Sequence, residues 1–296
     1  MSASQKTLLV IAGPTAVGKT ALCVRLAQEL KTDVVSADSR QFYRELTIGT
    51  AKPSLEEMGG VRHHFIDSHS IAETYTAGMY EADCLRCLAE LFQKKDVVIL
   101  TGGSGLFLKV ITDGLDEMPP AVPEIREALQ AWMQQDGLPA LVEELRQSDP
   151  VYCEKVDKKN PQRIIRALEV CRSTGQPYSD FRRGAKVARP FQSLKICLTR
   201  DRDELYARID SRMDAMLAAG LIDEVRPLLP YRHHNPLQTV GYQEVFPYLD
   251  GLYDYAELVR LLKRNSRRYA KRQLTWFRNQ GDYEWIDPKS MLNAEL

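Results

Sequence analysis

A glycine-rich segment near the N-terminus has the residue types and spacing of a phosphate-binding loop. GPTAVGKT fits the pattern G-x-x-x-x-G-K-[ST] and consists of Gly13, Pro14, Thr15, Ala16, Val17, Gly18, Lys19 and Thr20. The glycines let backbone N–H groups converge on phosphate oxygens, and the lysine adds a positive charge. A hydroxyl at the last position can bind Mg²⁺. The segment therefore predicts a site for a phosphorylated ligand, with Thr20 as a ligand of Mg²⁺.

Such a loop needs a strand before it and a helix after it, and the sequence supplies both. TLLVIA, residues 7–12, is an apolar run of strand length, and ALCVRLAQEL, residues 21–30, repeats apolar residues at helical spacing. Further short strand candidates are separated by helical patterns, at residues 33–38, 96–103, 194–200 and 283–288. This alternation is typical of a parallel α/β sheet.

The stretch from residue 105 to residue 194 has no good strand candidate. It consists mostly of helical patterns, bounded by the breaker-rich segments GLDEMPPAVP and GAKVARPFQ. We therefore predict an α/β fold with a P-loop NTPase-like parallel sheet core and a helical insertion domain. The expected core comprises residues 1–113 and 192–296, and the expected insertion comprises residues 114–191.

A carboxylate follows the second predicted strand, in VVSADSRQFY. Ligands of open α/β sheets bind at the carboxyl ends of the strands, so Asp38 should face the phosphate loop. There it could hold Mg²⁺, accept a proton from a nucleophile, or merely cap a helix. The apolar strand VVIL ends instead in TGGSG, residues 101–105, without the acid that organises Mg²⁺ in hydrolytic phosphate-loop proteins.

Charge is balanced overall but unevenly spread. The chain has 40 Lys and Arg against 40 Asp and Glu, yet residues 158–189 hold nine basic residues and two acids, and residues 263–278 hold seven and none. Two such segments with aromatic residues indicate a nucleic-acid surface or, alternatively, solvated helix faces. With no apolar run of transmembrane length and no signal-peptide pattern, we expect a cytoplasmic protein without a membrane partner.

Eight motifs, in order along the chain, resemble the tRNA dimethylallyltransferases (tRNA isopentenyltransferases) of bacterial type. They are GPTAVGKT, SADSRQFY, LTIGTAKP, HHFIDS, TGGSGLFLK, NPQRIIRALEV, TVGYQEV and AKRQLTWFR. The resemblance runs from about residue 8 to residue 278, and no C₂H₂ pattern follows it. It implies a phosphate-loop kinase-like core with a helical insertion, in agreement with the prediction from the residues.

The resemblance implies transfer of a dimethylallyl group from dimethylallyl diphosphate to N6 of the adenine 3′-adjacent to the anticodon of tRNA. The products would be N6-dimethylallyladenosine and diphosphate. The phosphate loop with Lys19 and Mg²⁺ would hold the diphosphate, and Asp38 matches the residue that takes the proton of the N6 amine. Arg208 matches a residue that reaches the diphosphate, with an exposed salt bridge as its alternative role.

The resemblance also implies contacts with the anticodon stem-loop of tRNA, and we expect a monomer. The matching positions are Asp38, Ser39, Arg40, Gln41, Ser104, Arg126, Gln162, Arg163, Ile164, Ile165 and Arg166, with the segment TVGYQEV, residues 239–245, as a further RNA-facing loop.

Three alternatives stay open. An adenylate isopentenyltransferase would act on free nucleotides, although GTAKP, residues 49–53, and the basic insertion are expected of the tRNA enzymes. A small-molecule phosphate-loop kinase would transfer a phosphoryl group. A non-catalytic RNA-binding protein would keep a relic loop, although intact Lys19, Thr20 and Asp38 argue against it.

Overall fold

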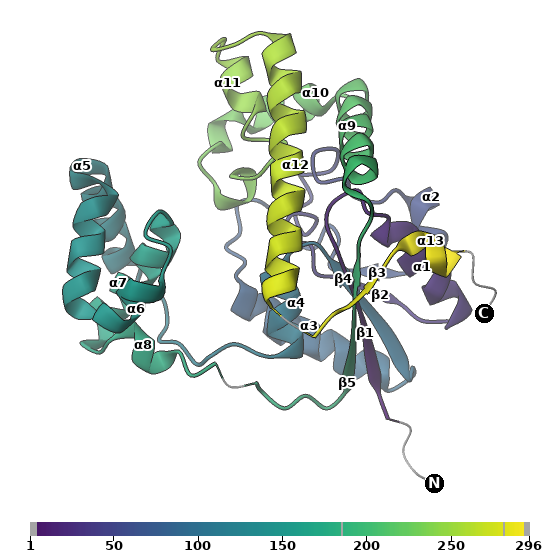
Figure 1. Cartoon of the computed structure of the whole chain (residues 1–296), viewed down its shortest axis with the longest axis horizontal. Helices are drawn as coiled ribbons and strands as arrows, with labels where there is room; N and C mark the ends of the chain where they lie inside the picture. The colour runs from purple at the N-terminus through teal and green to yellow at the C-terminus, as the bar shows by residue number, and fades with distance from the viewer. Residues whose placement is uncertain (1–4, 185, 281, 293–296) are drawn as a thin grey trace. The chain divides into compact units, whose positions relative to one another are not determined.

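The structure is a computed structural model that describes residues 5–184, 186–280 and 282–292 (Figure 1). The chain forms two compact units. The core unit comprises residues 1–112 and 189–296, and the insertion unit comprises residues 113–188. Each unit has its own hydrophobic core, so each is described separately.

The core unit is built on a parallel sheet of six strands in the described residues, in the order β3-β2-β4-β1-β5-β6. The strands are β1 (Thr7–Ala12), β2 (Val34–Ser36), β3 (His63–His64), β4 (Val97–Gly102), β5 (Gln192–Leu198) and β6 (Glu284–Ile286). The predicted parallel α/β sheet is confirmed. Strand β3 was not predicted, because two residues are too few to show an alternation.

Helices cover both faces of this sheet, which explains why its strands are apolar without alternation. In β4, Ile99 packs with residues of α1, whereas Val98 and Leu100 pack with residues of α3 and α4 on the other face. The helices of the core unit are α1 (Lys19–Glu29), α2 (Leu55–Met58), α3 (Ala77–Phe92), α4 (Gly105–Thr112), α9 (Arg202–Ala218), α10 (Leu221–Val225), η1 (Arg226–Tyr231), η2 (Asn235–Leu237), α11 (Val245–Leu249), α12 (Tyr255–Asn279) and α13 (Pro288–Leu292).

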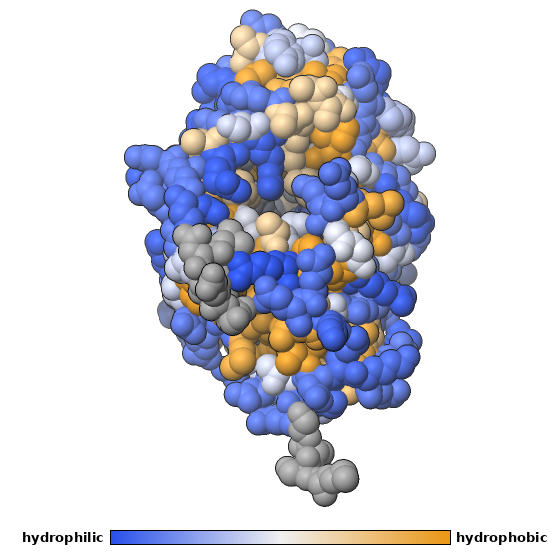
Figure 2. Space-filling view, turned by 90° about the vertical axis from the view of Figure 1, so that its right-hand side faces the viewer, coloured by the Kyte–Doolittle hydropathy of each residue, from blue (hydrophilic) through white to orange (hydrophobic). Residues whose placement is uncertain are grey.

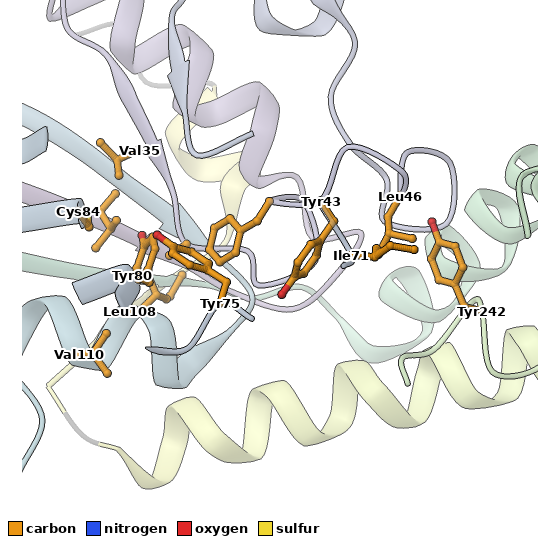
Figure 3. Packing of buried hydrophobic residues seen from close by; sticks show 14 of the residues in the cluster. Val35, Tyr43, Leu46, Ile71, Tyr75, Tyr80, Cys84, Leu108, Val110 and Tyr242 are labelled. Atoms are coloured by element: carbon orange, nitrogen blue, oxygen red, sulfur yellow. The ribbon is translucent and has the colours of Figure 1, made fainter. Parts of the chain in front are cut away.

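An aromatic cluster supports the end of β2 (Figure 3). The ring of Phe42 stacks on Tyr80 at 5.2 Å between centroids and meets Tyr75 edge-on at 5.5 Å. The Tyr80 hydroxyl donates a hydrogen bond of 2.9 Å to the carbonyl of Ser36. This cluster therefore fixes the point at which the chain leaves β2 and enters the segment that carries Asp38.

The insertion unit is helical, with α5 (Pro123–Ser148), α6 (Pro150–Lys155), α7 (Pro161–Thr174) and α8 (Tyr178–Phe181). Proline begins three of these helices, where its missing N–H costs no helical hydrogen bond. Helix α5 is kinked at Gly137, which has a φ of 79°. Helices α5 and α7 enclose a core of apolar side chains that includes Leu141, Leu145 and Leu168.

Across the described residues, no helix is long and apolar enough to span a bilayer. On the face of the molecule seen in Figure 2, hydrophobic residues form separate patches among hydrophilic ones.

Candidate functional site

A cavity of about 500 Å³ lies in the core unit, where β1, β2 and β4 end. Its lining includes residues 15–20 of the phosphate loop, Asp38 after β2, and Thr101–Gly103 after β4. Residues of helices α9 and α12 also line it. Asp38 and the phosphate loop therefore line one cavity, as expected from the carboxyl ends of parallel strands.

The phosphate loop presents an uncapped helix end to this cavity. Helix α1 begins at Lys19, and the preceding Gly18 has a left-handed φ of 109° and makes no side-chain capping bond. The first turn of α1 contains no acidic residue. The N–H groups at this end are thus free to bind an anion, and the helix dipole favours one.

Lys19 folds back over the loop that precedes it. Its Nζ donates hydrogen bonds of 2.9 Å to the carbonyl of Gly13 and 2.8 Å to the carbonyl of Pro14. Burial lowers the pKa of Lys19 to about 8, and the nearby Asp38 opposes that shift. A bound anion would favour the charged form, so Lys19 is suited to a ligand that carries phosphate groups.

Arginines from the C-terminal half of the chain hold the same loop. Arg208 Nε donates to the carbonyl of Ala16 at 2.8 Å, and Arg200 Nε donates to the carbonyl of Val17 at 2.8 Å. Arg208 is exposed, lines the cavity and makes no ion pair in the described residues, so the structure shows no salt bridge there.

Arg212, one turn further along α9 from Arg208, also lines the cavity, and its Nη1 lies 3.4 Å from the Thr15 hydroxyl. Burial and the neighbouring Arg208 lower the pKa of Arg212. Sequence reasoning missed Arg212, although its spacing of four residues from Arg208 on a helix would have indicated it.

Asp38 lies in a tight turn rather than at a helix start. Its Oδ1 accepts a 3.0 Å hydrogen bond from the N–H of Arg40, and no helix begins here, so the helix-capping alternative is wrong. The next residue, Ser39, is tied to Ser104 after β4, since the Ser104 hydroxyl lies 3.1 Å from Ser39 N and 3.0 Å from its hydroxyl. Tyr269 of α12 lines the same cavity, and burial, reinforced by Asp38, raises its pKa to about 12.

Two of the family-like motifs meet beside the cavity through Glu224 of α10. Its carboxylate accepts hydrogen bonds from Ile48 N at 2.7 Å, Gly49 N at 3.0 Å and the Tyr242 hydroxyl at 2.6 Å. Gln41 Nε2 donates hydrogen bonds to backbone carbonyls of GTAKP, including that of Ala51 at 3.1 Å. GTAKP and TVGYQEV are thus held together, and sequence reasoning did not identify Glu224.

The predicted RNA contacts of the insertion unit fall into three groups. Gln162 and Arg163 are exposed at the start of α7. Arg126 and Arg166 converge on one oxygen of the fully buried Glu169, at 2.6 and 3.2 Å.

The third group corrects a prediction. Ile164 and Ile165 lie in the core of the insertion unit with exposed fractions of 0% and 6%. Their predicted contact with tRNA is therefore wrong for the side chains, which pack against α5 and α6 instead.

The basic run of α12 has two kinds of member. Lys263 and Arg267 pair with Asp214 and Asp210 of the neighbouring α9, at 2.8 and 2.6 Å (Figure 1). Four others follow one stripe at helical spacing and form no ion pair in the described residues: Arg264, Arg268, Lys271 and Arg272. The seventh, Arg278 at the end of the helix, lies over the ring of Trp285 at 5.6 Å. This stripe is available to a polyanion.

The parallel sheet, the loop between β1 and α1 and the uncapped N-terminus of α1 define a P-loop-like α/β protein. A family model described as IPP transferase matches residues 41–280. The chain belongs to this family, the tRNA dimethylallyltransferases. The tRNA dimethylallyltransferase of Cytophaga hutchinsonii is 54% identical over 288 residues, which make up 97% of this chain and 95% of that protein.

Similar solved structures come from the same family. The tRNA isopentenylpyrophosphate transferase of Bacillus halodurans is 39% identical with a TM-score of 0.69, and the match covers 96% of this chain and 90% of that one. A eukaryotic dimethylallyltransferase is 26% identical with a TM-score of 0.80. Its crystal structures are described as snapshots of the enzyme acting on tRNA. That match covers 95% of this chain and 74% of the eukaryotic chain.

Proposed function

We propose that this protein transfers a dimethylallyl group from dimethylallyl diphosphate to N6 of the adenine 3′-adjacent to the anticodon in tRNA. The family and the relatives named as tRNA dimethylallyltransferases support this activity. The observation that carries the proposal is the single cavity lined by both the phosphate loop and Asp38. Such a cavity can bring a diphosphate ester and an amine together with a base beside the amine.

In this proposal the loop binds the diphosphate of the donor. The free N–H groups at the start of α1 and the ammonium of Lys19 surround the phosphate oxygens. As the allylic C–O bond breaks, negative charge grows on the departing oxygen. Fixed donors stabilise that charge more than they stabilise the ground state, which lowers the barrier. Arg208 and Arg212 would reach the diphosphate from α9.

Asp38 would act on the acceptor. The N6 nitrogen forms a bond to the donor carbon, the C–O bond breaks, and diphosphate leaves with the bonding electron pair. The nitrogen then carries an extra proton, which passes to the carboxylate of Asp38. A hydrogen bond from N6 to this carboxylate raises the electron density of a poor nucleophile during the same step.

The chain also offers donors for Mg²⁺. Thr20 lines the cavity, and its hydroxyl makes no hydrogen bond in the described residues. No cluster of three or more His, Cys, Asp or Glu side chains that could hold a metal occurs there. Mg²⁺ typically binds few protein oxygens together with substrate phosphates and water, so this donor set fits it. When bound, Mg²⁺ would neutralise charge on the diphosphate.

The RNA would approach from the side of α12. The target base must leave its stacked loop to reach the cavity, and it would be gripped by contacts to the flanking backbone. The unpaired stripe on α12 supports this role, with Arg268, Lys271 and Arg272 exposed. Exposed Gln162 and Arg163 would add contacts from the insertion unit. The protein would act as a monomer, since one core unit lines the whole cavity. Its substrate would be cytoplasmic tRNA.

The proposal is tested by incubating the protein with an unmodified tRNA transcript, dimethylallyl diphosphate and Mg²⁺, followed by nucleoside analysis. We expect N6-dimethylallyladenosine at one position of the transcript and an equal amount of diphosphate. A parallel incubation with AMP should give no product. Prenylated AMP with unmodified tRNA would instead identify an adenylate isopentenyltransferase.

A further inference from the structure

Gln273 of α12 joins two loops of the site with one amide group. Its Oε1 accepts a 3.0 Å hydrogen bond from Thr15 N in the phosphate loop. Its Nε2 donates a 2.9 Å hydrogen bond to the carbonyl of Gly103, after β4. The side chain is only 7% exposed. Both ends of a buried amide are therefore satisfied by backbone groups of segments that are far apart in the sequence.

The approach of α12 to this region depends on missing side chains. A Cβ on Gly103 would lie 2.3 Å from Gln273 Nε2, and a Cβ on Gly105 would lie 2.2 Å from the ring of Trp276. Two glycines of TGGSG thus let α12 pack directly on the turn between β4 and α4. Without them the amide of Gln273 could not occupy its present place.

The turn that Gln273 holds is also connected to the proposed base. Ser104 follows Gly103, and its hydroxyl is bonded to the backbone and hydroxyl of Ser39, the residue after Asp38. A chain of hydrogen bonds therefore runs from the phosphate loop through Gln273 and the turn to the segment of Asp38. The first link lies on the donor side of the cavity and the last on the acceptor side.

We propose that Gln273 is a positioning residue that sets the distance between the phosphate loop and the Asp38 segment. The role rests on the proposed transfer reaction. A misplacement of about 1 Å between reacting groups can cost about 10²-fold in rate. Loss of this link should therefore lower the rate of transfer more than it lowers the affinity for tRNA, because Gln273 is buried and is not one of the exposed basic residues proposed to bind the RNA backbone.

The test uses Gln273→Met, which removes both hydrogen bonds, and Gln273→Glu, which makes them depend on pH. A protonated glutamic acid can accept from Thr15 N and donate to the Gly103 carbonyl, as glutamine does. A glutamate cannot donate. Burial and the facing carbonyl favour the protonated form of such a group, so its pKa should be raised. Gln280→Met is the matched control, because Gln280 is exposed at the C-terminal end of α12, where its side chain accepts a hydrogen bond from Lys109.

The measurements are single-turnover rates at saturating tRNA and dimethylallyl diphosphate, each divided by the wild-type rate at the same pH. For Gln273→Met we expect a loss of about 10- to 100-fold at every pH. For Gln273→Glu the ratio should rise at least about fivefold from pH 8.5 to pH 6, as the side chain gains its proton. Gln280→Met should match the wild type.

A rate within twofold of wild type for Gln273→Met would overturn the inference, as would a flat ratio for Gln273→Glu. If Gln273→Met does not fold, the Gln273→Glu ratio decides alone. The affinity for inorganic diphosphate, measured by calorimetry, separates this inference from the proposed function. Should the wild type transfer nothing, Gln273→Met must still bind diphosphate at least about fivefold more weakly, since its loop is released. An unchanged affinity would then overturn the inference.

Discussion

The phosphate loop and the basic helix α12 are both built for anions, but in opposite ways. The loop uses backbone N–H groups and one half-buried lysine, all held in place by Arg208, Arg200 and Gln273. Helix α12 uses long, exposed side chains at helical spacing, such as Arg268 and Lys271. The first arrangement is held by hydrogen bonds at a cavity, and the second is exposed to solvent.

This difference suits the phosphate loop to the transfer reaction and helix α12 to RNA binding. Fixed donors in an enclosed site pay little reorganisation as charge develops, so they can act on a transition state. Exposed cations gain affinity mainly by releasing counterions from the RNA, which makes them sensitive to salt. Mutations in the two regions should therefore change different measured quantities.

The largest effect is expected at Lys19. Replacing it with methionine keeps the aliphatic stem and removes the charge that is proposed to bind the diphosphate. Loss of one such stabilising group typically costs about 10²- to 10³-fold in rate. We expect that loss in kcat/KM for dimethylallyl diphosphate, with tRNA affinity within twofold of wild type in filter binding. A loss of tRNA affinity as large as the loss of activity would erase the distinction between the two regions.

A smaller effect is expected on α12. Arg268→Ala with Lys271→Ala should weaken tRNA binding about tenfold and reduce the slope of log K against log salt by roughly 1 to 2 units. The matched control is Lys263→Ala with Arg267→Ala, which removes the same charge from residues paired with α9. The control should keep the wild-type slope. Equal slopes for the two double variants would show that net charge, rather than the unpaired stripe, binds the RNA.

Arg163 should contribute one contact from the insertion unit. Arg163→Ala is expected to weaken tRNA binding about threefold and to change the salt slope by less than about 1 unit. Arg172→Ala is the control, because Arg172 is held by Glu144 through two hydrogen bonds of 2.8 and 2.6 Å. If both variants bind tRNA as the wild type does across a salt series, the insertion unit has no part in RNA binding through α7.

The smallest expected effect is a pH dependence of donor binding at the phosphate loop. Burial holds the pKa of Lys19 at about 8, so near pH 8 roughly half of the molecules carry a neutral lysine. An anionic donor raises that pKa, so binding at pH 8 should take up about half a proton, and affinity should fall as pH rises above 8. Calorimetry in buffers of different ionisation enthalpy measures this uptake. Proton uptake that persists in Lys19→Met would assign it to another group.

The sequence predicted the parts of the site that lie close together in the chain. The phosphate loop and Asp38 follow strands whose positions and carboxyl ends could be deduced from apolar runs alone. Gln273 and Arg212 reach the same cavity from helices near the other end of the chain, 258 residues from Thr15 in the case of Gln273. Such contacts arise from helix packing. The spacing of four residues shows that Arg212 shares a helix face with Arg208, but neither this spacing nor the motif AKRQLTWFR around Gln273 says which loop the helix meets.

The segment from Gln162 to Arg166 shows a second limit. A motif lists consecutive residues, but successive residues of a helix point in directions about 100° apart. Ile164 and Ile165 therefore face the core of the insertion unit while Gln162 and Arg163 face solvent. Helical periodicity applied within the motif would have separated them.

In the proposed reaction, Asp38 accepts the proton of the attacking amine while the phosphate loop holds the leaving group. Asp38→Asn tests it most directly, because asparagine keeps the shape and can still accept the hydrogen bond from Arg40 N. Single-turnover transfer at saturating tRNA and dimethylallyl diphosphate should slow by about 10²- to 10⁴-fold, with both affinities within about twofold of wild type. A folded Asp38→Asn variant that transfers at nearly the wild-type rate would contradict the claim.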